Sequence, residues 1–283
     1  MARAAAIEPD NPSTYRGGSG EPLVLVHGGG GTPRLWRTTI PLLEPHHDVL
    51  AVTLAGHFGG SEIRRGGATL EALVAAVEAD MDEAGFDTAH VAGGSLGAWV
   101  ALELGRRGRA RSVVAIAPAG GWERGSREVR RVVWIYRTLL TGSRLLGRFA
   151  HLVAGRPRLR RLAAWHHFAH PERISPDDFE YMIAAVGAPG LLEGLAWALT
   201  APGAENLHEI TCPVLLAFPE TDHILPRPRY GERIVKAIPH AEVVELPGVG
   251  HAAMVDDPEL VARTIVVFAA RHAAAQPAGV AER

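Results

Sequence analysis

A serine between glycines is the clearest candidate for chemistry in this chain. Residues 93–97 read Gly-Gly-Ser-Leu-Gly, so Ser95 has glycines two positions before it and two positions after it. The apolar residues before this motif favour a strand, and residues 96–107 have helical spacing. A turn this sharp between a strand and a helix leaves no room for side chains at Gly93 and Gly97, and it lifts the serine above the sheet edge. The sequence therefore predicts that Ser95 is a nucleophile.

His251 is the candidate for the base that a serine hydroxyl needs before it can attack a substrate. It ends the sequence Gly-Val-Gly-His at 248–251, between the apolar run 243–246 and a helix that we expect from Asp257 to Ala270. This places it in a loop at the carboxyl end of the predicted sheet, where the active sites of α/β proteins form. We therefore predict that His251 takes the proton of Ser95.

Asp222 is the candidate for the acid that orients the histidine and stabilises its cation. It follows the apolar run 214–218, in the loop Pro-Glu-Thr-Asp-His. Glu220 is the nearest competitor, and the alternative for either carboxylate is an ordinary solvated loop charge. With Asp222 the three residues come in the chain order Ser, Asp, His, which differs from the orders of chymotrypsin-like and subtilisin-like enzymes.

A glycine-rich loop could supply the donors that stabilise an oxyanion. Residues 27–31 are a histidine and four glycines, directly after an apolar run that we expect to be a buried strand. Acyl transfer needs two hydrogen-bond donors at the developing negative charge. We assign them to the backbone amides of Gly29 and Leu96, with Gly28 and Gly30 as the alternatives to Gly29.

The elements that must position these residues alternate along the chain. Apolar, β-rich runs predict strands at 23–26, 49–54, 90–92, 113–117, 214–218 and 243–246. Helical spacing predicts helices at 69–84 and 96–107 and, after the Asp-Pro start signal, from Asp257 to Ala270. Strands alternating with helices indicate a parallel sheet covered on both faces.

The alternation stops between about Gly121 and Leu207, where we find helix-like stretches and no convincing strand. This segment holds four of the six tryptophans, and its first part, residues 124–161, contains 11 arginines. The simplest interpretation is a helical insertion with a solvated basic face. Attraction to an acidic substrate group or contact with a membrane surface are the alternatives, the second less favoured.

Composition excludes several other classes of protein. The chain has 283 residues, a formal net charge of −2 and 47% hydrophobic residues, which predicts a globular domain without an overall attraction to nucleic acid. Its one cysteine, Cys212, lies in an apolar run and is expected to be a buried, inert thiol. The start of the chain has no apolar signal core and no run approaches the roughly 20 residues of a membrane span, so we expect a cytoplasmic protein.

Taken in chain order, these motifs resemble the α/β-hydrolase family, in the group with a helical lid on a fold-1-type domain. The resemblance runs from about Gly20 to Ala270, apart from the lid. Its landmarks are the His27-Gly28 loop with Trp36, Ala55-Gly56-His57, the Ser95 turn, Asp222 and Gly250-His251. It implies an α/β fold with a mostly parallel eight-stranded sheet flanked by helices, and two-step acyl-enzyme hydrolysis without cofactor or metal. It also implies a core of residues 1–121 and 208–283 and an inserted helical cap of residues 122–207.

The start of the chain departs from the family pattern. The strand that leads to His27 begins near Leu23, so that the antiparallel hairpin usual before it is shortened. Residues 1–20 are rich in small residues, glycine and proline, and we expect a short arm or one weak strand there. None of the three candidate catalytic residues is affected.

The resulting hypothesis is a serine hydrolase that cleaves an ester-like bond of a small, largely apolar substrate. The side chains and backbone expected to contact the substrate are those of Gly28, Trp36, Trp134, Trp165 and Phe168. The oligomeric state is not indicated by the sequence.

Other functions remain open at this point. Hydrolysis of a carbon–carbon bond, a thioester or a lactone would use the same three residues, and an arginine that binds a carboxylate would favour the first. Family members that cleave epoxides or carbon–halogen bonds use an aspartate nucleophile, so Ser95 argues against both. Tyrosines that would activate an epoxide are not obvious either, since only Tyr136 and Tyr181 lie in the insertion. A non-catalytic binding protein on the same fold is the alternative of another class.

Overall fold

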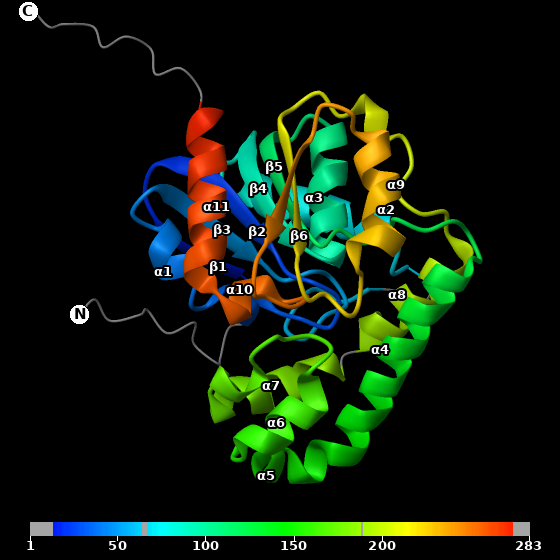
Figure 1. Cartoon of the computed structure of the whole chain (residues 1–283). Helices are drawn as coiled ribbons and strands as arrows, with labels where there is room; N and C mark the ends of the chain where they lie inside the picture. Colours follow the sequence, from blue (N-terminus) through cyan, green and yellow to red (C-terminus); the bar gives the residue numbers. More distant parts are fainter. Residues whose placement is uncertain (1–13, 64–66, 188, 274–283) are drawn as a thin grey trace, which may run out of the picture.

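One sheet of seven strands runs through the residues that the computed structural model describes, which are 14–63, 67–187 and 189–273 (Figure 1). The strands are β1 (Thr14–Gly18), β2 (Glu21–Val26), β3 (His47–Val52), β4 (Ala89–Gly94), β5 (Ala110–Ile116), β6 (Val214–Pro219) and β7 (Glu242–Leu246). Across the sheet their order is β1-β3-β2-β4-β5-β6-β7. Every neighbouring pair is parallel except β1 and β3, which are antiparallel at one edge.

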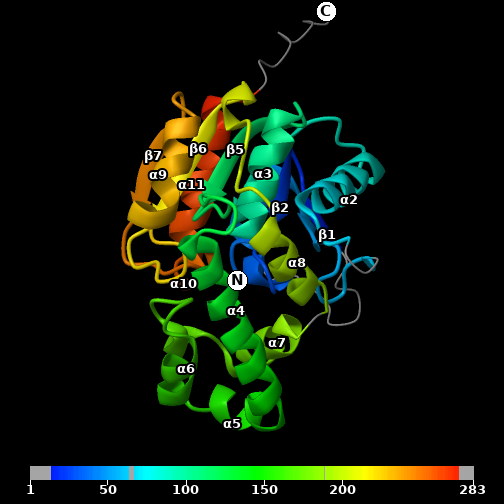
Figure 2. The same ribbon diagram turned by 90° about the vertical axis from the view of Figure 1, so that its right-hand side faces the viewer.

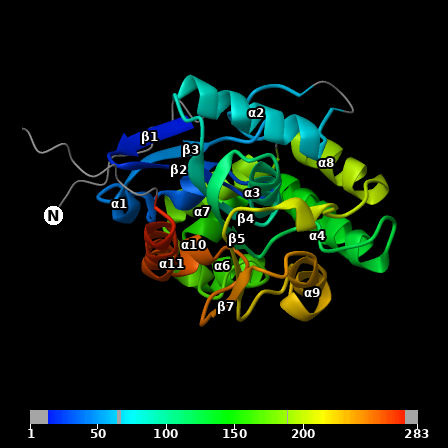
Figure 3. The same ribbon diagram turned by 90° about the horizontal axis from the view of Figure 1, so that it is seen from above.

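Helices cover both faces of this sheet. The α helices are α1 (Ile40–Leu43), α2 (Leu70–Glu83), α3 (Leu96–Arg106), α4 (Arg127–Leu146), α5 (Ala150–Ala154), α6 (Pro157–Ala164), α7 (Pro176–Val186), α8 (Pro189–Thr200), α9 (Arg227–Ala237), α10 (Ala253–Asp256) and α11 (Pro258–Arg271). The short 3-10 helices are η1 (Pro33–Trp36), η2 (Gly147–Phe149), η3 (Pro171–Arg173) and η4 (Leu207–Glu209). Figure 3 shows α1 and α11 on one side of the sheet and α2, α3 and α9 on the other.

Strand β2 shows why the sheet is buried on both sides. Side chains alternate between the two faces of a strand. Leu23 and Leu25 pack in one core cluster with Phe268 of α11, whereas Val24 and Val26 pack in the other, which contains the residues of α2 and α3. Both sets of alternating side chains are apolar, which is the pattern of a central parallel strand.

The expected alternation of strands and helices is confirmed, although the number of strands differs. The family resemblance implied eight strands, and the described residues form seven. The weak strand expected within residues 1–20 is β1, which pairs directly with β3 and forms the sheet edge. An earlier strand would fall in residues 1–13, outside the described residues. The sequence prediction also omitted α9, because its buried side consists of a few residues such as Tyr230 and Ile234 among many charges.

The segment between β5 and β6 is helical, as expected, and its described residues contain no strand. Its longest helix, α4, begins after Ser126, whose hydroxyl accepts a hydrogen bond from the Val129 amide. Figures 1 and 2 both show α4, α5, α6 and α7 extending beyond one end of the sheet. This is the end at which β4 leads into the Ser95 turn.

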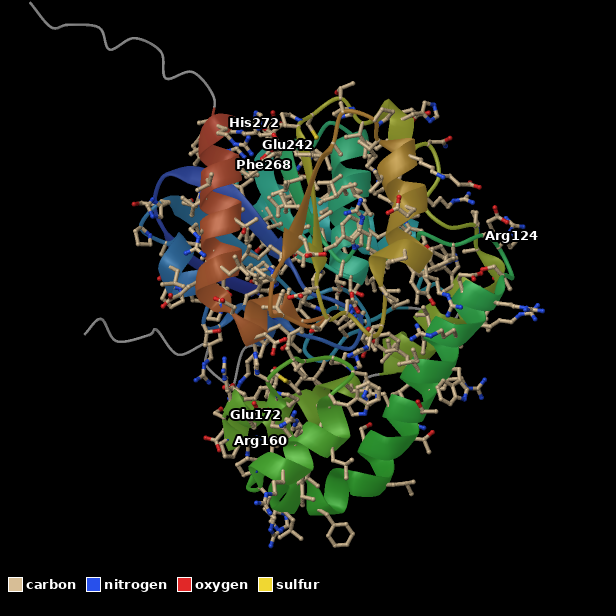
Figure 4. The ribbon with its side chains drawn as sticks, viewed as in Figure 1. Arg124, Arg160, Glu172, Glu242, Phe268 and His272 are labelled. Carbon is tan, nitrogen blue, oxygen red and sulfur yellow. The ribbon has the colours of Figure 1, made fainter. Side chains whose placement is uncertain are left out.

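Arg160, one of the arginines of the basic stretch, connects helices within the segment between β5 and β6. The side chain of Arg160 is buried, and Figure 4 shows it beside Glu172. Its Nη2 donates to the Glu172 carbonyl at 2.8 Å and its Nε to the Pro171 carbonyl at 3.3 Å, and Nη1 donates to the carbonyl of Ala154. These bonds connect α5, α6 and η3, so this arginine does not belong to a solvated face.

The described helices contain no single one that is long and apolar enough to cross a membrane. The sharply bent pair formed by α7 and residues 190–200 of α8 reaches that length and composition only when both parts are counted together.

Cys212 has the environment of an unreactive thiol. It is half-buried and unpaired, and burial raises its pKa to about 11. A thiol is nucleophilic only as the thiolate, so Cys212 remains protonated and inert at neutral pH.

Candidate active site

Ser95 lies in a strained turn between β4 and α3. Its φ of 56° and ψ of −114° fall outside the regions that side-chain-bearing residues ordinarily occupy. The turn is held on both sides: the Ser95 amide donates to the Ile116 carbonyl at 2.9 Å, and the Ser95 carbonyl accepts from the amides of Trp99 and Ala119 at 3.1 Å each. Hydrogen bonds to β5, to α3 and to the loop after β5 therefore hold Ser95 in this strained conformation.

The two outer glycines of the motif are required by direct backbone contact. A Cβ atom at Gly93 would lie 2.3 Å from the Gly97 carbonyl oxygen, and one at Gly97 would lie 2.2 Å from the Val26 carbonyl oxygen. Neither oxygen can move freely, because one belongs to the backbone of α3 and the other to that of β2. The prediction that the turn leaves no room for side chains at Gly93 and Gly97 is thus confirmed.

Asp222 and His251 form a buried hydrogen-bonded pair. His251 Nδ1 lies 2.8 Å from Asp222 Oδ2, and each residue is 5% exposed. The other carboxylate oxygen, Oδ1, accepts from the amides of Ile224 at 2.8 Å and Leu225 at 2.9 Å. Both oxygens are therefore occupied, and the carboxylate cannot rotate away from the imidazole.

The electrostatics of this pair favour a charged carboxylate. Burial by itself raises the pKa of Asp222, but the His251 ring and the amides of Leu225 and Ile224 outweigh it and hold the pKa below its usual value. An ionised Asp222 accepts a hydrogen bond from the Nδ1–H of His251, which leaves Nε2 as the nitrogen that can act as a base.

Glu220, the competing acid, has a different task. Its Oε2 accepts from the Gly248 amide at 2.8 Å, and the Thr221 amide and hydroxyl both donate to the Val249 carbonyl. These contacts bind the loop after β6 to the loop that carries His251. Glu220 thus braces the histidine loop, whereas Asp222 contacts the histidine itself.

Asp256 ties the helical insertion to the histidine loop. Its Oδ2 accepts from the amides of Gly250 and Ala169, both at 2.8 Å, and its Oδ1 accepts from the His170 amide at 3.1 Å. The Ala252 amide also donates to the His167 carbonyl at 2.9 Å. The residues on either side of His251 are therefore bound to the backbone of residues 167–170.

The glycine loop is held by the ring of His27, which is fully buried. The Leu54 amide donates to His27 Nε2 at 3.0 Å, so the ring proton must be on Nδ1, which donates to the Gly28 carbonyl at 2.8 Å. Burial, with a further contribution from His57, lowers the pKa of His27 to about 3, so the ring stays neutral. The loop that contains Gly29 is thereby fixed beside the Ser95 turn.

The proposed oxyanion donors lie next to each other. A Cβ atom at Gly29 would contact the Leu96 side chain at 3.8 Å, and one at Gly28 would lie 3.3 Å from Ser95 Cβ. Leu96 is the first residue of α3, where amides have no acceptor within the helix. Gly29 thus lies beside Leu96, and Gly28 lies beside Ser95.

A cavity of about 320 Å³ lies between the sheet end and the helical insertion, and both Ser95 and His251 line it. From the core it is lined by the loop from Gly28 to Thr32, and from the insertion by residues of α4, α6 and α7. Apart from the polar groups at its base, its walls are largely apolar, including Leu139, Phe168 and Met182. A small organic molecule fits this volume.

Tyr136 of α4 lies near Ser95. It is buried, lines the cavity and lies close enough to the Ser95 side chain for Ser95 to influence the pKa of Tyr136. Burial raises its pKa to about 12, so that the hydroxyl keeps its proton. His251 Nε2 is buried and has no hydrogen-bond partner within the described part of the chain. The structure therefore shows His251 Nε2 without a hydrogen bond to Ser95, whose side chain has Tyr136 as a neighbour.

His167 completes the polar base of the cavity. Its ring lies against that of His251 with centroids 6.0 Å apart and against that of Tyr136 with centroids 5.9 Å apart. Burial, with the nearby His251 and His166, lowers its pKa to about 3. The His167 ring is therefore neutral near pH 7 and adds no positive charge beside His251.

The residues expected to contact substrate divide into two groups. Gly28 and Phe168 line the cavity as predicted. Trp36 does not, because it is fully buried in the core cluster beneath α11. Trp134 is 65% exposed and Trp165 52% exposed, and neither lines the cavity.

The positions of these two tryptophans have a physical cause. Tyr136, Leu139 and Ser143 recur at helical spacing and place one face of α4 on the cavity, so Trp134, two residues from Tyr136, points to the opposite face. Trp165 follows the last turn of α6 and packs on His223, with ring centroids 5.1 Å apart.

Tyr136, Arg34 and Tyr181 line the cavity but were not predicted as site residues. The helical spacing of α4 could have grouped Tyr136 with Leu139. Which face of that helix meets the core depends on packing between segments, and no signal in the sequence fixes it.

The described residues contain no group of three or more His, Cys, Asp or Glu side chains placed to hold a metal ion.

Comparison with known proteins agrees with this architecture. Residues 23–264 match the model of the alpha/beta hydrolase family. The epoxide hydrolase EphH of Mycobacterium tuberculosis is 35% identical over 198 residues, which are 68% of this chain and 91% of that protein. The putative carbamate hydrolase RutD of Azorhizobium caulinodans is 27% identical over 252 residues, 89% of this chain and 92% of that protein. A thermophilic esterase from Thermogutta terrifontis shares the fold, with a TM-score of 0.71, 20% identity and coverage of 92% and 93% of the two chains.

Proposed function

The chain belongs to the alpha/beta hydrolase family and is a hydrolase of that family, and on this premise we propose that it cleaves an ester-like bond with Ser95 as nucleophile, His251 as base and Asp222 as the orienting acid. The substrate is small and largely apolar, and residues 122–207 act as a cap over it. One observation carries the proposal: the buried Asp222–His251 pair and the strained Ser95 turn border the same apolar cavity.

The first half of the reaction forms an acyl-enzyme. When substrate enters the cavity, the serine hydroxyl turns to His251 Nε2. The base removes the hydroxyl proton as the oxygen attacks the carbonyl carbon. The amides of Gly29 and Leu96 stabilise the oxyanion, and His251 then gives the proton to the leaving alcohol.

The second half uses water in place of the serine. His251 removes a proton from water, which attacks the acyl carbonyl, and Ser95 leaves with that proton. Asp222 stabilises the imidazolium in both halves without becoming protonated. Because Asp222 Oδ1 is held by two backbone amides, the acid keeps its position through the whole cycle.

The test is hydrolysis of p-nitrophenyl esters from acetate to decanoate by the wild type and by Ser95→Ala. We expect turnover by the wild type with an optimum at short to medium chain length, and a loss of several orders of magnitude in the variant. A serine-reactive phosphonate should label the wild type and leave Ser95→Ala unlabelled. A wild type that neither turns over any ester nor reacts with the phosphonate would contradict the proposal.

Carbon–carbon bond, thioester and lactone hydrolysis remain the alternatives with the same residues. If the wild type reacts with the phosphonate yet turns over none of the esters, these bond types become the candidates. Parallel assays with an acyl-thioester, a lactone and a vinylogous diketone then separate them.

The name of the relative EphH raises epoxide opening as a further possibility to test. Attack of a serine oxygen on an epoxide would form an ether, which the Asp222–His251 pair could not hydrolyse. We therefore expect no diol from styrene oxide under conditions in which esters turn over. Multiple turnover of the epoxide would contradict the assignment of Ser95 as the nucleophile.

A further inference from the structure

Arg34 is the only permanently charged side chain among the described residues that line the cavity. It comes from η1, directly after the glycine loop, and not from the basic stretch of the insertion. No aspartate or glutamate of the described residues lines the cavity with it. A single cation in a largely apolar cavity creates a strong preference for a negative group, because a charge interacts more strongly where water is scarce.

The charge of Arg34 is only partly balanced. Its Nε lies 2.7 Å from Asp178 Oδ1, but Arg37 Nη1 lies 2.9 Å from the same oxygen. The second oxygen of Asp178 accepts from the Ser175 hydroxyl at 2.6 Å. Two guanidinium groups thus share one carboxylate. Arg34, Arg37 and Asp178 together therefore keep one net positive charge.

The outer nitrogens of Arg34 remain available. Its guanidinium carbon lies 4.5 Å from the centroid of the Tyr181 ring, which also lines the cavity. Within the described part of the chain only Nε of this side chain makes a hydrogen bond. Its side chain is 15% exposed, so the guanidinium lies in a nearly closed site. A planar fork of this kind binds a carboxylate through two parallel bonds.

We propose that the cavity binds a substrate that carries a carboxylate at a distance from the bond cleaved, with Arg34 as its binding partner. The proposal rests on the proposed function, since it takes Ser95 as the position of the scissile carbonyl. The substrate is then a monoester, or a comparable acyl compound, of a dicarboxylic acid. Its apolar chain lies along the cavity walls, and Tyr181 keeps the guanidinium in place.

The test compares charged and neutral substrates of equal length. Mono-p-nitrophenyl esters of glutaric, adipic and suberic acid are measured against p-nitrophenyl esters whose acyl chains end in a methyl group. The quantity compared is the ratio of kcat/KM for the charged ester to that for the neutral ester. We expect this ratio to be highest at one chain length, which gives the span between Ser95 and Arg34.

Three variants distinguish direct contact from a general effect of charge. Arg34→Gln should lower the ratio by about tenfold to a hundredfold, the contribution of hydrogen bonds to a charged group. Arg37→Gln, which removes the same charge outside the cavity, should lower it by less than about threefold, as a screened charge does. Asp178→Asn should raise it, because it removes the carboxylate that competes for Arg34.

Several results would overturn the inference. A wild-type ratio that does not vary with chain length, or equal losses in Arg34→Gln and Arg37→Gln, would show that Arg34 makes no specific contact. If neutral esters still turn over and depend on Ser95, the inference fails and the proposed function stands.

Binding provides a readout that does not need catalysis. Adipate titrated calorimetrically into Ser95→Ala should bind more weakly when Arg34→Gln is added, and Arg37→Gln should change the affinity little. This measurement tests the subsite even if no ester is hydrolysed, and unchanged affinity in the Arg34→Gln variant would contradict the inference. Melting temperatures of all variants show whether a loss reflects unfolding.

Discussion

Asp222 contacts His251 through one oxygen and its own backbone turn through the other. Oδ2 lies 2.8 Å from Nδ1 of the histidine, while Oδ1 accepts from the amides of Ile224 and Leu225. The two sides of the carboxylate are therefore not interchangeable. This asymmetry determines what a neutral substitute would do at this position.

Asp222→Asn should lower kcat by about 10⁴-fold, the size of the loss for the same change in the serine-protease triad. The two backbone amides select the asparagine oxygen for the Oδ1 position, so its NH₂ group must face His251 Nδ1. The ring then carries its proton on Nε2 and cannot accept one from Ser95. Ester turnover measures the effect.

Glu220→Gln is the matched control for this change. It removes a neighbouring carboxylate that braces the histidine loop through Gly248. We expect a loss of no more than about tenfold, because a neutral amide oxygen still accepts that bond. Equal losses in the two variants would contradict the assignment of the acid.

Tyr136→Phe should accelerate labelling of Ser95 by a serine-reactive phosphonate. The Tyr136 hydroxyl lies beside Ser95, and among the described residues His251 Nε2 has no hydrogen-bond partner. Removing the hydroxyl frees the serine for the base, and a neutral hydrogen bond corresponds to a change of about two- to tenfold. Tyr181→Phe, which alters the cavity without touching Ser95, is the control. Slower labelling in the Tyr136 variant would show instead that the hydroxyl helps the attack.

Asp256→Ala should reduce kcat and loosen two loops together. The change removes the acceptor for Gly250, Ala169 and His170. Among the described residues, the only remaining hydrogen bond between the histidine loop and the insertion is then the one from the Ala252 amide to the His167 carbonyl. We expect a loss of about tenfold or more, because misplacement of a catalytic group by 1 Å can cost 10²-fold.

Hydrogen exchange provides the second readout for Asp256. The amides of residues 168–170 and 248–252 should exchange faster in the variant than in the wild type. Glu242→Gln, an acidic residue of β7 whose ion pair with Arg271 lies on the surface, should leave exchange and activity in both loops unchanged. Faster exchange in only one loop would contradict a shared tie.

Gly97→Ala should destabilise the protein, whereas Gly194→Ala should not. The new Cβ at position 97 would lie 2.2 Å from the Val26 carbonyl oxygen, and strain of this kind costs about 1–3 kcal/mol or more. Position 194 lies in α8 with open space around it, where alanine favours the helix by up to about 1 kcal/mol. Urea unfolding of both variants measures the difference, and equal stability would contradict the close contact.

Stability should fall as the pH drops from about 6.5 toward 3, in part because of His27. Its folded pKa of about 3 lies below that of the unfolded chain, near 6.5. Between these values the unfolded chain binds a proton that the folded protein does not, so the stabilisation present above pH 6.5 is lost as the pH falls. The slope is about 1.4 kcal/mol per pH unit for one such histidine.

The check is the free energy of unfolding against pH for the wild type and His27→Gln. The amide keeps one hydrogen-bonding group of each kind and does not titrate, so the variant should have the shallower slope between pH 4 and 6. Identical slopes would show that His27 is not held neutral in the folded state.

Much of the candidate site could be predicted from the sequence because it depends on local patterns. The turn at Ser95 needs small residues at fixed positions, and the strand and helix on either side of it have their own periodicities. The same holds for the loops with Asp222 and His251, since the carboxyl ends of parallel strands meet at one edge of the sheet.

Only the tertiary structure decided what surrounds these residues. The sequence assigned Trp36, Trp134 and Trp165 to the substrate because they are aromatic, yet one lies in the core and two face outward. It gave no reason to place Tyr136 on Ser95 or Arg34 in the cavity. Local patterns determine which elements form, but the face that each helix of the insertion turns to the sheet depends on packing between segments far apart in the chain.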